Sequence, residues 1–266
     1  MAEPTPSSLT AVSSLAPLVP FPAERLEPRP TPVDEEIEEM AWELERFVDA
    51  RSDRARRFVD VALSSMALAA LAPVMSIVAL AIKLDSPGPV FYAQDRVGIN
   101  RRRAERRQGN RAGSGRRRIV NAGRPFRIYK FRTMRTDAEA AGPQWARDGD
   151  PRITRIGAIL RKTRLDEVPQ FINVLRGDMT LVGPRPERPF FVDILQSEIP
   201  HYSKRLLVKP GITGLAQVNN GYDDSIESVR HKVMWDLRYI RAQNARAHLQ
   251  ILIKTVRTVL TGEGAC

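Results

Sequence analysis

The sequence contains a single cysteine, Cys266, among its 266 residues. No internal disulfide can form, and a cysteine-rich metal site is excluded. The three histidines are scattered, and neither a His-Glu-x-x-His zinc motif nor a glycine-rich Walker loop occurs. The N-terminus lacks a basic stretch leading into an apolar run, so we expect no cleavable signal peptide. These absences remove the commonest zinc and phosphate-loop sites from consideration.

Charge is distributed very unevenly along the chain. The formal net charge is +11, yet residues 1–50 hold eleven acidic and three basic residues, a net charge of −8. Residues 95–135 hold fifteen basic and two acidic residues, a net charge of +13. This asymmetry indicates anionic partners, which could be membrane headgroups, nucleotide phosphates or nucleic acid.

The N-terminal region divides into two parts. Residues 1–33 contain eight prolines and are predicted to be a disordered tail. Residues 34–58 are predicted to form an acidic amphipathic helix that leads into a basic stretch, with an apolar face formed by Ile37, Met40, Ala41, Leu44, Phe47 and Val48. This helix could dock on its own domain or lie flat at a membrane interface.

Residues 59–84 are predicted to be a membrane segment. Residues 61–82 carry no charge, and a bilayer needs about 20 apolar residues to be crossed. A buried soluble helix and a spanning helix are the alternatives. Pro73 interrupts helical bonding near the middle, and both flanks are basic, which the positive-inside rule would place on one side. We therefore predict a re-entrant helix hairpin with both flanks on the cytoplasmic side of a membrane and Asp60 near its mouth.

Residues 85–266 are predicted to form the catalytic domain, of α+β class and mostly helical with a small β-hairpin. Pro89–Val97 and Pro125–Met134 have the composition of its two strands. Between them, the basic loop 100–123 has no aromatic residue to stack on bases, which favours lipid headgroups or solvation over nucleic acid. Helices are expected over 164–177 and in two amphipathic stretches, around 226–240 and 249–260, that either pack in the core or rest on the membrane.

The most informative segment runs from Arg161 to Pro189. It contains two adjacent carboxylates, Asp166 and Glu167, several basic residues, and Arg185 in a proline-stiffened turn. Acids near a helix N-terminus often only stabilise the helix dipole. Adjacent ionised carboxylates nevertheless repel unless a cation lies beside them, and arginine binds phosphate oxygens bidentately. The cluster therefore indicates a site for a metal-bound, phosphate-bearing substrate, with a carboxylate ionised at neutral pH.

The ordered motifs make the chain recognisable. They are S-P-G-P-V-F-Y at 86–92, K-F-R-T-M at 130–134, L-R-K-T-x-L-D-E-x-P-Q at 160–170, N-V-L-R-G-D-M-x-L-V-G-P-R-P at 173–186 and K-P-G-I-T-G-x-A-Q-V at 209–218, after Arg56, Arg57 and Asp60. In this order they resemble the monotopic phosphoglycosyl transferases, bacterial sugar transferases that start lipid-linked glycan assembly. The resemblance covers about 56–262.

The resemblance implies transfer of a sugar 1-phosphate from a UDP-sugar to polyprenyl (undecaprenyl) phosphate, starting an exopolysaccharide, capsule or O-antigen repeat. It implies a nucleophilic Asp166, which forms a covalent phosphosugar intermediate, and an assisting Glu167, with both carboxylates available to Mg²⁺. It also implies that Arg161, Arg185, Lys130 and Arg132 bind substrate. Anionic lipids are expected partners, nucleic acid is not, and a homodimer is possible.

Two departures and two rival functions accompany this interpretation. The family often breaks its membrane helix at Ser-Pro, whereas Ala72 precedes Pro73 here. An arginine expected after Gln217-Val218 is absent, with Arg230 as a conceivable substitute. A metal-dependent phosphohydrolase of nucleotide sugars or polyprenyl diphosphates would use Asp166 purely as a metal ligand. A basic membrane-bound scaffold or nucleic-acid-binding protein would use the carboxylates only as a helix cap.

Overall fold

The structure is a computed structural model that describes residues 31–47, 53–100, 123–140, 142, 144, 149–219 and 225–261. The tail predicted over 1–33 lies outside these residues except for its last three. The basic loop 100–123 lies outside them except for its two end residues. The helix predicted from Asp34 begins slightly earlier, at Pro32, a residue well suited to a first helical turn.

The described residues are mostly helical, as predicted. The helices are α1 (Pro32–Phe47), α2 (Asp53–Asp85), α4 (Arg155–Lys162), α5 (Gln170–Arg176), α6 (Pro189–Glu198), α7 (Leu215–Asn219), α8 (Ile226–Ala242) and α9 (Ala245–Thr261). The 3₁₀ turns are η2 (Leu165–Glu167) and η3 (Tyr202–Leu207). The strands are β1 (Phe91–Val97), β2 (Pro125–Phe131), β3 (Thr180–Val182) and β4 (Gly211–Thr213).

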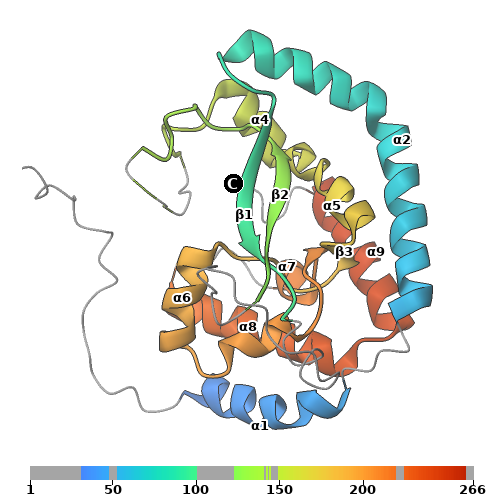
Figure 1. Ribbon diagram of the computed structural model, residues 1–266, viewed down its shortest axis with the longest axis vertical. Coiled ribbons are helices and arrows are strands. Elements are labelled where there is room, and N and C mark those ends of the chain that lie inside the picture. Colours follow the sequence, from blue (N-terminus) through green and yellow to red (C-terminus); the bar gives the residue numbers. More distant parts are fainter. Residues whose placement is uncertain are drawn as a thin grey trace, which may run out of the picture.

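Two small strand pairs organise the domain (Figure 1). The predicted hairpin is confirmed: β1 and β2 pair antiparallel, with Phe91 opposite Phe131 and Val97 opposite Pro125. A second pair, in which β3 runs parallel to β4, was not predicted. Strands of three residues show no alternation that a sequence pattern can reveal. Parallel strands also need a long connection, here provided by α6 and η3.

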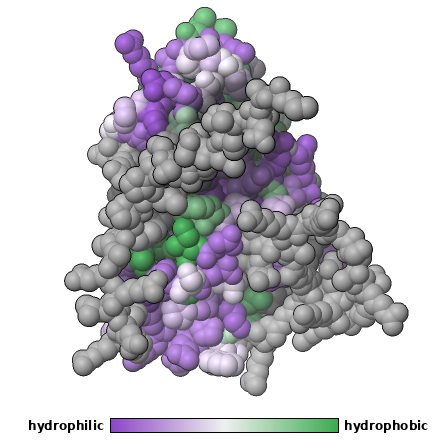
Figure 2. Space-filling model, turned by 60° about the vertical axis from the view of Figure 1, so that its left-hand side comes forward, coloured by the Kyte–Doolittle hydropathy of each residue, from purple (hydrophilic) through white to green (hydrophobic). Residues whose placement is uncertain are grey.

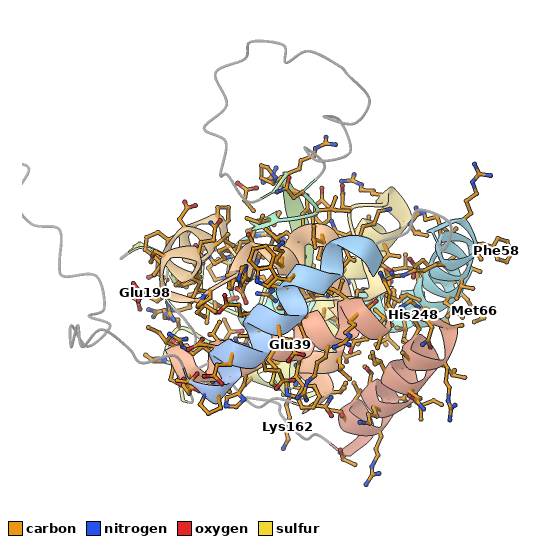
Figure 3. The ribbon with its side chains drawn as sticks, turned by 90° about the horizontal axis from the view of Figure 1, so that it is seen from below. Glu39, Phe58, Met66, Lys162, Glu198 and His248 are labelled. Carbon is orange, nitrogen blue, oxygen red and sulfur yellow. The ribbon has the colours of Figure 1, made fainter. Side chains whose placement is uncertain are left out.

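Helix α1 docks on the catalytic domain, which decides between the two alternatives left by its amphipathic pattern. Ile37 and Leu44 are completely buried, and α1 packs along α8. Asp34 pairs with Arg230, and Glu36 pairs with Arg238. Figure 1 shows α1 beneath α8, and Figure 3, seen from below, shows it crossing this face of the domain. The apolar stripe of α1 is therefore part of the protein core.

Helix α2 is continuous from Asp53 to Asp85 but bends, so that its C-terminal part passes over α4 (Figure 1). The break predicted at Pro73 is corrected, since the segment is a single bent helix. Pro73 removes only one backbone donor, and the remaining helical bonds suffice to continue the helix. The hydroxyl of Ser76 donates to the Ala72 carbonyl at 3.1 Å, a bond that bends helices when it occurs beside a proline kink.

Both ends of α2 are fixed to the same domain. Near its start, the buried Asp60 accepts bonds from the Thr180 hydroxyl at 2.7 Å and the Leu181 amide at 3.1 Å. These bonds fix the start of α2 to β3. Near its end, Val78 and Ile82 pack in a small apolar cluster with Phe131 and Leu160.

Much of the apolar surface of α2 is exposed. Among the described residues, it is the one helix long and apolar enough to cross a membrane, and only 11% of its most apolar window is buried. Phe58 and Met66 are 75% and 63% exposed and point away from the domain in Figure 3. In Figure 2 hydrophobic residues also appear at the top of the molecule, where Figure 1 places the C-terminal part of α2.

Candidate active site

The centre of the site is a partly buried cluster of one carboxylate and two cations. The Lys130 Nζ lies 2.7 Å from Oε1 of Glu167. The Arg185 guanidinium bonds both oxygens of the same carboxylate, with Nη1 3.1 Å from Oε2. Side-chain exposures are 12% for Glu167, 19% for Lys130 and 28% for Arg185. Residues from β2, η2 and the Gly183–Pro186 turn thus meet at one place, as the motifs predicted.

Asp166 lies beside this cluster but makes no hydrogen bond with it. It is 7% exposed, and no described residue donates a hydrogen bond to its carboxylate. Arg161 exerts its charge on Asp166 from the last turn of α4. Its Nη1 is buried and has no hydrogen-bond partner among the described residues. A buried guanidinium donor without an acceptor is costly, and a phosphate oxygen is a suitable acceptor for it.

The two adjacent carboxyl groups have opposite pKa shifts. Burial opposes ionisation of Glu167, but Arg185 and Lys130 outweigh it and hold its pKa well below the usual range. Burial raises the pKa of Asp166, against the attraction of Lys130 and with the repulsion of Glu167. Lys130, Arg185 and Arg161 do favour ionised Asp166, as predicted, but burial outweighs them and the net shift of its pKa is upward. The cations are engaged with Glu167, so desolvation dominates at Asp166.

Local backbone geometry places the pair. Arg164 precedes η2 in the left-handed region at φ 59°, an uncommon conformation for a residue other than glycine. The helix predicted over 164–177 is split into η2 and α5 at Val168-Pro169, with Asp166 and Glu167 in the separate 3₁₀ turn. At the other end, Gly177 at φ 83° caps α5. Asn173 ties α5 to β2 by accepting from the Tyr129 amide at 3.0 Å and donating to the Arg127 carbonyl at 2.7 Å.

Glycines join the turn that carries Arg185 to β4. The Gly183 amide donates to the Thr213 carbonyl at 2.8 Å, and the Gly211 amide donates to the Pro184 carbonyl at 3.0 Å. A Cβ atom on Gly211 would overlap the backbone of Gly183. Two of the sequence motifs, G-P-R-P and K-P-G-I-T-G, are therefore a single packed unit in space.

Arg132 is the predicted substrate residue that the structure does not bring to the carboxylate pair. Its guanidinium donates to the carbonyls of Pro87 and Ser86, at 2.5 and 2.7 Å, and to the Ser86 hydroxyl at 3.0 Å. It therefore braces the Ser86–Gly88 turn after α2. Arg230 is similarly engaged, with Asp34 and the Glu198 carbonyl, and is not available as the substitute phosphate ligand.

A divalent cation would find few protein ligands here. Among the described residues, no three His, Cys, Asp or Glu side chains gather into a metal cluster. Asp166 offers an unbonded carboxylate, while the Glu167 carboxylate already holds two cations. This set fits Mg²⁺, which is often bound by one or two carboxylates and completed by substrate phosphates and water.

Sequence reasoning missed a second layer of charge behind Arg185. Glu187 lies 2.7 Å from the Lys232 ammonium and 3.4 Å from the Arg96 guanidinium. Arg205 lies 2.7 Å from Asp236, and these two side chains are 2% and 1% exposed. The only signal in the sequence was the 3.6-residue period of α8, which places Lys232 and Asp236 one turn apart, on one face.

Comparison with known proteins agrees with the motifs. The family described as "Bacterial sugar transferase" matches residues 51–106 and 110–262. The chain is 44% identical over 210 residues to the UDP-N-acetylgalactosamine-undecaprenyl-phosphate N-acetylgalactosaminephosphotransferase of Aeromonas hydrophila, covering 79% of this chain and 44% of that protein. It is 38% identical over 215 residues to the UDP-glucose:undecaprenyl-phosphate glucose-1-phosphate transferase of Caulobacter vibrioides, covering 80% of this chain and 72% of that protein.

A third relative has a similar length. The Exopolysaccharide production protein PSS of Rhizobium leguminosarum bv. phaseoli is 38% identical over 216 residues, which cover 79% of this chain and 97% of that protein. The chain thus spans less than half of the Aeromonas relative but nearly all of the Rhizobium one. The shared region includes the cation-bound Glu167, the adjacent Asp166 and the turn that carries Arg185. This chain belongs to the bacterial sugar transferase family.

Proposed function

We propose that this protein transfers a sugar 1-phosphate from a UDP-sugar to polyprenyl (undecaprenyl) phosphate, and so starts a lipid-linked polysaccharide. The names of the relatives support the donor and acceptor classes. Those names differ in the sugar, N-acetylgalactosamine in one and glucose in the other, so the proposal covers UDP-sugars as a class. The name of the Rhizobium relative supports an exopolysaccharide as the product.

The proposal rests on one observation: the two adjacent carboxyl groups have different partners. Glu167 is occupied by Lys130 and Arg185, whereas Asp166 accepts no hydrogen bond from the described residues. Pairs of titratable groups whose surroundings push their pKa values apart commonly have different chemical roles. Asp166 is the free nucleophile, and Glu167 holds the two cations beside it.

The chemistry follows in two displacements at one phosphorus atom. An Asp166 carboxylate oxygen attacks the β-phosphorus of the UDP-sugar, the bond to the bridging oxygen breaks, and UMP leaves. An oxygen of polyprenyl phosphate then attacks the phosphosugar, and the Asp166 carboxylate leaves. Arg161, with its unpartnered Nη1, and Arg185 neutralise phosphoryl oxygens during both steps. A covalent intermediate lets one pocket serve a soluble and a lipid substrate in turn.

Mg²⁺ is proposed as the metal, held by Asp166 and Glu167 together with the diphosphate. When bound, it neutralises phosphate charge and favours the ionised form of Asp166. This contribution opposes the effect of burial, which raises the pKa of Asp166.

The membrane role rests on α2. Both of its ends contact the same domain, so a bend in the apolar middle allows the helix to enter and leave one leaflet. A straight crossing would put the ends on opposite sides. Helix α9 offers a second apolar surface, since Leu249, Ile253 and Val256 are 59%, 61% and 60% exposed. We place the protein on the cytoplasmic face of the inner membrane, against anionic lipids.

A coupled transfer assay tests the proposal. Detergent-purified protein receives polyprenyl phosphate, Mg²⁺ and each UDP-sugar of a panel, and UMP and lipid-linked product are measured. We expect UMP and polyprenyl diphosphate sugar in equal amounts with at least one donor. Sugar phosphate released steadily without acceptor would instead support the phosphohydrolase. No turnover with any donor would contradict both enzymes.

A further inference from the structure

The carbonyl groups of the turn that carries Arg185 are all hydrogen-bonded. Four successive carbonyl groups, those of residues 184–187, each accept a hydrogen bond from a described donor. The donors are the Gly211 amide at 3.0 Å, the Arg205 Nη2 at 2.9 Å, the Arg96 Nη1 at 3.0 Å and the Val97 amide at 2.9 Å, in that order. Two of these four donors are side chains, so the conformation of the turn depends on residues remote in sequence.

Arg205 is the deepest of these donors. It lies in η3, and its side chain is 2% exposed. One guanidinium nitrogen donates to the Arg185 carbonyl and lies 2.7 Å from Asp236, while the other donates to the Tyr202 hydroxyl at 2.9 Å. Asp236 belongs to α8, which is packed in the core along most of its length. The guanidinium therefore connects a rigid helix directly to the residue that binds Glu167.

We propose that Arg205 and Asp236 are positioning residues, which hold Arg185 in register with the catalytic carboxylates. This inference rests on the proposed transferase function and extends it to residues that contact neither substrate nor Glu167. Asp236 attracts the Arg205 guanidinium by its charge, and Arg205 holds the Arg185 carbonyl by a hydrogen bond. A planar guanidinium with several donors suits this bridging task, whereas lysine offers one compact charge.

Glu187 reinforces the same arrangement from the next position. Its carboxylate is held by Lys232, one turn before Asp236 on α8, and by Arg96 of β1. Arg96 also supplies the donor to the Pro186 carbonyl. One face of α8 is thereby linked to the turn on both sides of Arg185.

The opposite side of α8 provides the control. Arg230 and Arg238 lie two residues from Lys232 and Asp236, about 200° around the helix, and pair with Asp34 and Glu36 of α1. The Asp34–Arg230 pair is also buried, with exposures of 8% and 10%. Asp34→Asn therefore breaks a comparable ion pair on the same helix without touching the turn.

The test must separate positioning from stability. Removing one partner of a buried ion pair is strongly destabilising, but replacing both by apolar residues is often tolerated. The key variant is therefore Arg205→Met with Asp236→Leu, and Arg205→Lys is a second, milder change. Thermal unfolding is measured for each, followed by the rate of phosphosugar adduct formation at saturating UDP-sugar and Mg²⁺.

We expect the double variant to unfold within a few degrees of wild type and to form adduct at least about tenfold more slowly, since small misplacements in active sites have effects of this size. Arg205→Lys should show a smaller loss in the same direction. Asp34→Asn should retain the wild-type rate even if it unfolds earlier. In an Arg185→Ala background, adding the double change should have little further effect, because the two act through one side chain.

Each contrary result has a distinct meaning. An unchanged rate in both the double variant and Arg205→Lys overturns the positioning role. An equal fold-loss with and without Arg185 shows that the pair does not act through Arg185 and overturns it as well. Absence of adduct in wild type with every donor overturns the proposed function, and with it this inference.

Discussion

Glu187 offers a quantitative prediction about the layer behind the site. The Lys232 ammonium at 2.7 Å and the Arg96 guanidinium at 3.4 Å hold this carboxylate in its ionised form, against the effect of burial. They lower the pKa of Glu187 from 4.5 to about 2. Glu187→Gln removes the charge with little change of shape, and so isolates this contribution.

The magnitude and its pH dependence follow from linkage. A carboxyl group whose folded pKa lies below its unfolded pKa stabilises the protein above the unfolded value, and the stabilisation is lost as pH falls. The shift of Glu187 corresponds to roughly 3 kcal/mol at pH 7, and about 1.4 kcal/mol of this survives at pH 3. Glu187→Gln should therefore unfold more easily than wild type at pH 7, and the difference should shrink by more than half at pH 3.

Urea unfolding in detergent, followed by tryptophan fluorescence, measures this difference at each pH. The matched control is Glu227→Gln on α8, the helix that carries Lys232, because Glu227 is 53% exposed and its nearest approach to Arg230 is 3.8 Å. A surface pair of this kind contributes about 0–1 kcal/mol. A difference between wild type and Glu187→Gln that is the same at pH 7 and pH 3 would refute the reasoning.

Three further predictions concern the turn, the carboxylate cluster and the membrane helix. Gly211→Ala would drive a methyl group into the opposing backbone. We expect it to lower the free energy of unfolding by about 1–3 kcal/mol and to lower the Tm in thermal unfolding; an unchanged Tm would contradict the packing. Glu167→Gln leaves two partly buried cations without their carboxylate, so we expect a loss of stability of about 1–3 kcal/mol and no adduct formation; full activity would contradict its role. Cysteine probes at Glu39 and Lys162, in a cysteine-free background, should both react from the cytoplasmic side; separated probes would contradict re-entry.

Much of the fold was accessible from the sequence because several local signals agree. The β1–β2 hairpin, α1, α8 and α9 each have a clear hydrophobic period, and their existence is confirmed. The membrane helix was recognised from its apolar length, but its shape was not. One proline removes one donor, and whether a helix then breaks or bends depends on neighbouring bonds, such as the one from Ser76, and on what holds its two ends.

Part of the site was predicted from sequence motifs rather than from hydrophobic periods. Asp166, Glu167, Lys130 and Arg185 occur in motifs, and the structure brings all four together. Arg132 occurs in the same motif as Lys130 but braces a turn instead. Two residues that are two apart on a strand share a face only if the strand continues, and β2 ends at Phe131.

The supporting residues could not be found from sequence at all. Arg205 and Asp236 are far apart in the chain, and each looks like an ordinary surface charge until burial is known. The direction of the pKa shift of Asp166 could not be predicted from the sequence either. It depends on which carboxylate the cations face, and adjacent positions in a sequence do not reveal that.

The most direct test of the central claim is covalent trapping on Asp166. Wild-type protein and Asp166→Asn are incubated with Mg²⁺ and UDP-sugars labelled at the β-phosphate, without acceptor lipid, and the protein is digested and analysed by mass spectrometry. We predict a phosphosugar on the peptide containing Asp166, absent from Asp166→Asn and released when polyprenyl phosphate is added. Transfer of the sugar phosphate to lipid without any adduct, or an adduct that persists in Asp166→Asn, would contradict the proposed mechanism.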